Sequence, residues 1–345
     1  MGTTSSLTHG YFGGGQIIPG YTKQSIVQRI DYSNDTAVGV LRGPITSAIS
    51  YSCATGNTAF GYWMGGYVSS EISTVDRVDY SSDTLTATPR GNLNTARYRT
   101  QAGLANESYG YYAGGMDPST TSDVDRIDFS NDTSTSLARG PLNAISYLCS
   151  GSGNNNFGYV TGGSPPTAKT TVDRIDYSSD TSTAVTKGPL SQARRQPSAT
   201  GDSSYGYWSG GATPTKVSTV DRLDYSSDTT TAVAKGPLTA IRNNHASTGS
   251  RINGFPSSES FWKDMTGKGH DGTVDGATYQ GGNIGVWNFD GSGSSVTSGP
   301  HIITSHSNDF DFGSVDFAIE AWCRPTNASV IDPSIVALWN FPDNK

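Results

Sequence analysis

A segment of 48 or 49 residues occurs five times in succession in this 345-residue chain, and this repetition constrains the fold more than any other feature. The most constant part of each copy has the form Val-Asp-Arg-Ile-Asp-Tyr-Ser-Ser-Asp-Thr. Its arginines are Arg29, Arg77, Arg126, Arg174 and Arg222. A Gly-Gly pair before this part and a Gly-Pro-Leu-like sequence after it keep the same spacing. Three landmarks in one fixed order predict a repeat protein in which each copy forms one supersecondary unit.

One copy divides into four short strands. In the last copy we expect strands at residues 195–200, 205–209, 219–225 and 229–234, separated by turns rich in Gly, Ser and Asp. Gly210 and Gly211 end the second strand, because glycine lets the chain turn sharply. Four strands in about 48 residues is the size of one blade of a β-propeller. The sequence therefore predicts an all-β fold with a five-bladed propeller over residues 1–253.

The two ends of the repeat region predict how the ring closes. The chain enters the first copy at Gly10-Tyr11-Phe12, which corresponds to the second strand of a blade. Residues 246–249, after the fifth copy, have the character of a first strand. We expect them to pair beside residues 10–12, so that no long sheet edge is left open.

The recurring Asp-Arg-x-Asp strand carries charge into a sheet that neighbouring blades cover on both faces. An unpaired buried charge is costly, so each arginine should pair with the aspartate two residues later or with an aspartate of the adjacent blade. We predict a structural salt-bridge ladder of these five arginines with Asp31, Asp79, Asp128, Asp176 and Asp224. A row of ligand-binding residues is the alternative, and the sequence assigns no ligand-binding residue.

Composition and charge limit the possible partners. The net charge of −7 offers no electrostatic footprint for nucleic acid or for an anionic membrane. No apolar run approaches the length of a membrane span, and the first residues lack the basic and apolar regions of a secretory signal. We expect Cys53 and Cys149 to be buried free thiols, and Cys323 gives no disulfide framework with them.

Motifs of catalysis and metal binding are missing from the sequence. The five histidines show no zinc-ligand spacing, and there is no nucleophile elbow, P-loop or dinucleotide fingerprint. The sequence thus predicts no catalytic residue, no cofactor and no enzyme. Asp275-Gly276 and Asp290-Gly291 are interpreted as hairpin turns, with calcium binding in this C-terminal part as the alternative.

The order of landmarks in the repeat resembles that of Kelch proteins. The last copy carries it most fully, as Ala193-Arg194, then residues 206–211, residues 220–225 and Gly236-Pro237-Leu238. The resemblance implies a Kelch-like propeller, with Ala232 where the fourth strand of a Kelch unit has tryptophan. The near-identical repeats also resemble those of structural and tail-associated proteins of marine bacteriophages.

After Gly249 the repetition stops. Residues 262–273, 287–291 and 316–326 resemble, in order and spacing, the first half of a laminin-G-like, concanavalin-type jelly roll. This resemblance implies a partial β-sandwich over residues 254–345. We expect the sequence to end before such a domain is complete, because a two-sheet sandwich needs more chain to cover its core.

These resemblances imply a non-enzymatic structural or adhesive protein, a phage virion or tail-fibre component located in the virion or outside the cell. Its expected partners are other virion proteins or a host-surface glycan or receptor. A propeller enzyme acting on carbohydrate, either a Kelch-type oxidase or a glycosidase, is the alternative. Binding is expected on the C-terminal segment or on the variable loops after each Gly-Gly pair, at residues 16–25, 67–73, 116–122, 164–170 and 212–218.

Overall fold

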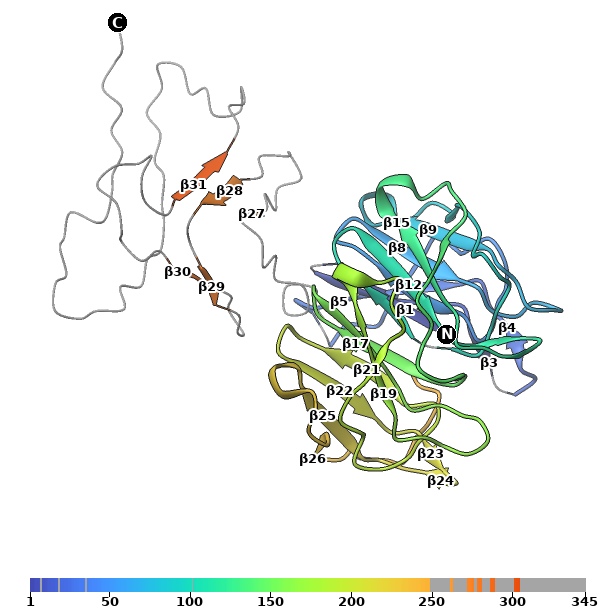
Figure 1. Cartoon of the computed structure of the whole chain (residues 1–345). Coiled ribbons are helices and arrows are strands. Elements are labelled where there is room, and N and C mark those ends of the chain that lie inside the picture. Colours follow the sequence, from blue (N-terminus) through green and yellow to red (C-terminus); the bar gives the residue numbers. More distant parts are fainter. Residues whose placement is uncertain are drawn as a thin grey trace, which may run out of the picture. The chain divides into compact units, whose positions relative to one another are not determined.

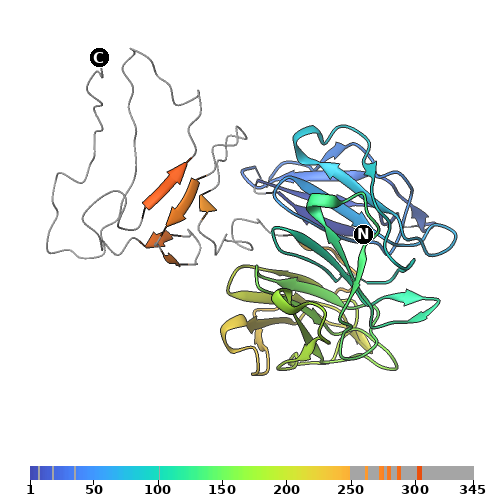
Figure 2. The same cartoon turned by 45° about the horizontal axis from the view of Figure 1, so that its top comes forward.

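The computed structural model describes residues 1–248 except 7, 18, 35 and 101, together with the backbone of five short strands further along the chain. Within residues 1–248, five antiparallel sheets of four strands each are arranged around a common centre (Figures 1 and 2). The prediction of an all-β, five-bladed propeller is therefore confirmed. In the described residues no helix is long and apolar enough to cross a membrane.

In each blade the four strands are arranged in sequence order, with the first strand at the centre of the propeller and the fourth at its outer edge. The strands are, in blade 1, β1 (Gly2–Ser5), β2 (His9–Gly13), β5 (Val27–Asp31) and β6 (Val40–Arg42); in blade 2, β7 (Cys53–Gly56), β8 (Phe60–Met64), β9 (Val75–Asp79) and β10 (Thr88–Pro89); in blade 3, β11 (Gly103–Ala105), β12 (Tyr109–Ala113), β15 (Val124–Asp128) and β16 (Leu137–Arg139); in blade 4, β17 (Ser150–Gly153), β18 (Phe157–Thr161), β19 (Val172–Asp176) and β20 (Val185–Thr186); in blade 5, β21 (Ser198–Gly201), β22 (Tyr205–Ser209), β25 (Val220–Asp224) and β26 (Val233–Lys235). Short hairpins, β3 (Gln16–Ile17) with β4 (Thr22–Lys23), β13 (Met116–Asp117) with β14 (Ser119–Thr120), and β23 (Ala212–Thr213) with β24 (Thr215–Lys216), stand in three of the variable loops.

Small residues allow the inner strands to approach one another closely at the centre of the propeller. The inner strands converge there, and their sequences consist almost wholly of Gly, Ala, Ser and Thr. A Cβ atom on Gly103 would lie 2.1 Å from the carbonyl oxygen of Ala54 on the neighbouring inner strand, so only glycine fits at that place.

Aromatic side chains hold neighbouring blades together. The tyrosine of a second strand stacks on the aromatic residue that follows the third strand of the next blade, with ring centroids 4.6–5.0 Å apart. The stacked pairs are Tyr11–Tyr80, Tyr62–Phe129, Tyr111–Tyr177 and Tyr159–Tyr225. Both faces of each internal sheet are thus covered by apolar contacts, which explains why the strands do not alternate cleanly between apolar and polar residues.

The predicted closure by residues 246–249 is wrong. The first blade obtains its inner strand from the N-terminus, because β1 pairs with β2 in the register Gly2↔Gly13 to Ser5↔Gly10. The two strands are adjacent in sequence, so they form a hairpin with little loss of chain entropy. Ser247 and Thr248 instead lie beside β1, where the Thr3 hydroxyl donates to the Ser247 carbonyl (2.6 Å) and the Thr248 hydroxyl to the Thr4 carbonyl (3.2 Å).

Beyond residue 248 the backbone of five strands is described. β27 (Phe261–Trp262), β28 (Gly272–Asp275) and β31 (His301–Thr304) form one sheet, and β29 (Thr278–Gln280) pairs with β30 (Val286–Asn288). The proposed jelly roll, the turns at Asp275-Gly276 and Asp290-Gly291 as possible calcium sites, and Cys323 lie wholly or partly outside the described residues. Cys53 and Cys149 are buried free thiols, as predicted, and burial raises the pKa of both.

Candidate functional site

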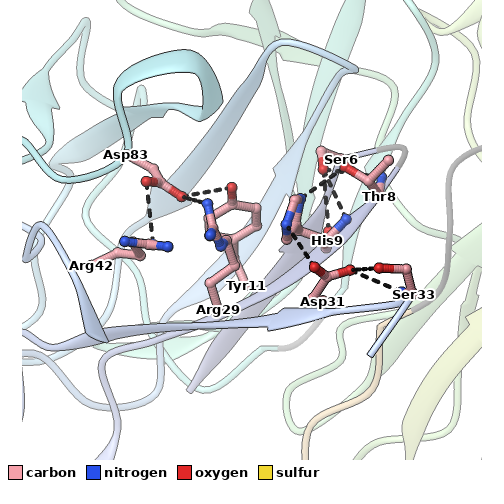
Figure 3. A network of polar contacts seen from close by, with 9 residues as sticks. All are labelled: Ser6, Thr8, His9, Tyr11, Arg29, Asp31, Ser33, Arg42 and Asp83. Carbon is pink, nitrogen blue, oxygen red and sulfur yellow. Dashed lines mark hydrogen bonds and ion pairs between the residues drawn. The ribbon is translucent and has the colours of Figure 1, made fainter. Parts of the chain in front are cut away.

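One carboxylate lies at the centre of each of four blade interfaces, and we call this arrangement the inter-blade node. At the first, Asp83 of blade 2 accepts hydrogen bonds from the Tyr11 hydroxyl (2.9 Å) and from Arg29 Nη1 (2.8 Å), both in blade 1 (Figure 3). Arg42 Nε lies 3.3 Å from the second carboxylate oxygen. The other nodes are Tyr62, Arg77 and Arg90 with Asp132; Tyr111, Arg126 and Arg139 with Asp180; and Tyr159, Arg174 and Lys187 with Asp228.

The structure thus gives four of the ladder arginines a different partner from the aspartates we listed. Asp79 Oδ1 instead accepts from the backbone nitrogen and the hydroxyl of Ser81, where it caps a short 3₁₀ turn. Asp128, Asp176 and Asp224 cap the same kind of 3₁₀ turn. In blade 1, Asp31 accepts from the nitrogen and the hydroxyl of Ser33 in an ordinary turn. The turn begins directly at this aspartate, so its carboxylate satisfies the free amides of the turn while the arginine reaches the next blade. Arg222, in the last blade, stacks on the Tyr205 ring at 4.3 Å.

Two fully buried ion pairs were not predicted. Arg97 Nη2 lies 2.7 Å from Asp125, and Arg194 Nη2 lies 2.8 Å from Asp221. Each arginine stands in the connection into a blade and also donates to backbone carbonyls there. The only sequence signal is the Ala-Arg pair before the first strand of blades 3 and 5. Where the arginine is missing, burial raises the pKa of the corresponding carboxyl group, as at Asp173.

The phenols of the nodes predict an alkaline limit to stability. Burial, together with the adjacent carboxylate, raises the pKa of Tyr11, Tyr62, Tyr111 and Tyr159 above the ordinary value of 10.0. The unfolded chain therefore loses these protons first, so their contribution is complete below about pH 10 and is lost as the pH rises further. We expect calorimetric melting temperatures to fall from about pH 10 upward, less steeply in Tyr111→Phe. Tyr21→Phe, at an exposed phenol, should leave the slope unchanged; equal slopes for the two variants would contradict the assignment.

At the start of the inner strands, one residue per connection has a left-handed backbone. These residues are Tyr51, Arg99, Leu148, Gln196 and Asn244, with φ of 53–61°. Each from Arg99 onward donates its backbone N–H to the carbonyl of the one before, at 2.6–3.2 Å, so the five form an arc around the centre. Left-handed residues other than glycine are strained, and such strain concentrates at functional sites. We call this end of the propeller the mouth.

The side chains at the mouth form an aromatic and cationic cluster. The Arg99 guanidinium carbon lies 5.6 Å from the ring centroid of Tyr51 and 5.2 Å from that of Tyr98. Tyr98 packs on Tyr67 at 5.2 Å, and Lys23 Nζ lies 4.9 Å from the Tyr67 ring. All five side chains are half-buried. We call these residues, Lys23, Tyr51, Tyr67, Tyr98 and Arg99, the mouth cluster.

The variable loops belong to the same surface. At four of the five left-handed positions, an isolated bridge joins the preceding residue to the first residue of a loop that follows a Gly-Gly pair. The bridged pairs are Ser50–Tyr67, Tyr98–Met116, Tyr147–Ser164 and Arg195–Ala212. The sequence identified the loops as variable but missed the left-handed residues. In the sequence these residues are marked only by their fixed position within the repeat, at which the residue type differs in every copy.

Away from the nodes and the mouth, the described residues offer few groups that could bind a ligand or take part in a reaction. A small central cavity is lined by Cys53, Gly103, Ser198 and His245 among others. His245 Nε2 lies 3.0 Å from the Ser209 hydroxyl, and burial lowers the pKa of this imidazole. In the part of the chain that the structure describes, no three His, Cys, Asp or Glu residues are grouped so that they could hold a metal ion.

No family model fits the chain, and no curated protein matches it. The function has to be inferred from the geometry of the site.

Proposed function

We propose that the protein is a non-enzymatic binding module that attaches through its mouth to a glycan or glycosylated receptor on a host surface. The observation that carries this proposal is the mouth cluster, in which Arg99 and Lys23 lie beside the faces of three tyrosines. Aromatic faces pack on the apolar faces of sugar rings, and the two cations supply hydrogen-bond donors for hydroxyl or carboxylate groups.

The distribution of variability supports a role in specific recognition. The nodes and stacked aromatics recur almost unchanged between blades, whereas the left-handed positions carry Tyr, Arg, Leu, Gln and Asn. A rigid scaffold that presents different side chains at equivalent places is suited to selecting one ligand. Half-burial of the cluster also limits the rotamer entropy lost on binding.

The resemblances support the biological setting of the proposal. In the order of its landmarks the repeat resembles Kelch units, and the near-identity of its copies resembles repeats of marine bacteriophage structural proteins. We therefore propose a phage virion or tail-fibre component, located in the virion or outside the cell, whose partners are host-surface glycans or receptors and other virion proteins. A second binding element in residues 254–345, of the laminin-G-like kind, is part of this proposal.

The proposal predicts a loss of glycan binding when the mouth cluster is changed. Wild-type protein is expected to bind members of an array of neutral and acidic oligosaccharides. Arg99→Ala and Tyr98→Ala should each weaken that binding about tenfold or more, since a cation–π contact or a charge-assisted hydrogen bond contributes about 1–3 kcal/mol. Val38→Ala, at a residue 90% exposed outside the mouth, is the control and should bind normally. Unchanged binding by both mouth variants, or cleavage of the oligosaccharides, would refute the proposal.

A further inference from the structure

The outer face of blade 5 lacks the neighbour that every other blade has. In blades 1 to 4, the glycine after the fourth strand donates its N–H to the carbonyl of the node aspartate in the next blade, each at 2.8 Å. A Cβ atom on any of these glycines would lie 1.8–1.9 Å from another carbonyl oxygen of that blade; they are Gly43, Gly91, Gly140 and Gly188. At the fifth equivalent, Gly236, no described atom lies within 4 Å of the same position.

The burial of side chains shows the same difference between blade 5 and the blades before it. Tyr159, Val172 and Leu190 of blade 4 are at most 2% exposed, because blade 5 covers them. Their equivalents in blade 5, Tyr207, Val220 and Leu238, are only half-buried. On the other side of the seam, Gly39 in the turn of blade 1 is only half-buried, whereas its equivalents in blades 2 to 5 are buried; these are Ala87, Ser136, Ala184 and Ala232. Blade 5 therefore does not pack on blade 1.

Residues 246–248 lie between blade 5 and blade 1 and mark the position of a sixth blade. The hydroxyl of Tyr32 in blade 1 lies 3.3 Å from the Thr248 hydroxyl. This contact repeats that of Tyr80 in blade 2 with Thr4 in the inner strand of blade 1, at 2.9 Å. Thr248 thus stands where the inner strand of a preceding blade would stand, and the Ser247 side chain touches Ser198 of blade 5 on the other side. The position is one blade wide and already holds the innermost strand.

The open side of blade 5 carries the donors of a fifth node without its acceptor. Tyr207, Arg222 and Lys235 correspond to Tyr159, Arg174 and Lys187, which converge on Asp228. Among the described residues, no carboxylate forms an ion pair with Arg222 or Lys235. Two cations, a phenol and the Gly236 N–H match the carboxylate and carbonyl of an aspartate in a turn, and four interfaces of this molecule use that match.

We propose that this seam is a docking site for a β-sheet segment of another polypeptide, which presents an aspartate in a Ser-x-Asp-Thr-like turn and completes a sixth blade in trans. The sequence after Gly249 contains no further Val-Asp-Arg strand, so the repeat itself does not provide the missing strands. A second intact copy does not fit, because its blade 1 is joined to blade 2 and the seam is one blade wide. The partner therefore offers three strands that lack an inner strand. This docking site is separate from the mouth.

The experiment uses the full chain and a synthetic peptide of residues 205–235, which comprises the three outer strands of one blade. Calorimetric titration is expected to show saturable binding of one peptide per chain. An Asp228→Asn peptide, and an Arg222→Gln/Lys235→Gln protein with the unaltered peptide, should each bind about tenfold or more weakly, because a hydrogen bond to a charged group contributes about 1.5–3 kcal/mol. Lys216→Gln, in the exposed β23–β24 hairpin, is the matched control and should bind as wild type does.

Two results would overturn the proposal. The first is a wild-type peptide that does not bind, or binding that is insensitive to both sets of substitutions. The second is a carbodiimide cross-link between Lys235 and a carboxylate within residues 250–345, which would identify the chain's own segment as the occupant. Because glycan binding is measured at the mouth, failure here leaves the proposed function standing, and the reverse also holds.

Discussion

Gly140→Ala is expected to be among the most destabilising single-methyl changes in this protein. The added Cβ would lie 1.9 Å from the Ser182 carbonyl oxygen, which belongs to the backbone of the next blade and has no rotamer with which to move away. The two blades would have to separate, which would disturb the hydrogen bond from Gly140 to Asp180. We expect a loss of about 3 kcal/mol or more in the free energy of unfolding, measured from urea midpoints at unchanged slope.

Gly236→Ala is the matched control for that variant. It is the same substitution at the same place of the repeat, but nothing among the described atoms lies within 4 Å of the new Cβ. We expect the urea midpoint to stay within error of wild type. If Gly236→Ala cost as much as Gly140→Ala, blade 5 would have to be packed against another blade, and the open seam would be refuted.

Asp180→Asn is expected to have the second large effect. The carboxylate is 8% exposed and neutralises Arg126 and Arg139 while accepting from Tyr111. Removing its charge leaves two largely buried guanidinium groups without a counter-ion, which costs about 3–5 kcal/mol for a broken buried pair. Denaturant unfolding of the purified variant measures the loss directly.

Asp176→Asn provides the comparison four residues earlier in the chain. It makes the same change in charge, yet Asp176 only caps the turn through the Ser178 nitrogen and hydroxyl. An asparagine oxygen accepts the same hydrogen bonds and caps about as well as a carboxylate, so we expect a loss well below ~1 kcal/mol. Equal losses for the two variants would mean that charge in general, and not the node, stabilises the interface.

The fold could be predicted because its signal is redundant. Each Gly-Gly pair is needed geometrically, as at Gly114 and Gly115, whose φ angles of 67° and 106° suit glycine. Because such constraints recur in every blade, they appear in the sequence as a period, and the period gives the number and size of the units. The N-terminal strand was missed because Gly2–Ser5 contains only small residues and no landmark.

The site was harder to predict because its residues have no constant identity. Asp79 and Asp83 both belong to the repeated segment, and only the path of the chain decides which one meets an arginine of the preceding blade. Tyr51 and Arg99 occupy equivalent backbone positions but share no chemistry. A search for repeated residues therefore passes over the very positions where the mouth is built.

The equivalence of the four nodes bears on how such a chain can evolve. Every interface uses the same tyrosine, arginine and aspartate, so any unit can follow any other without a new set of contacts. Unequal recombination between copies could therefore add or delete a unit while each surviving interface stayed intact. Each such event would add or remove one mouth position, so that ligand preference could change by recombination as well as by point substitution.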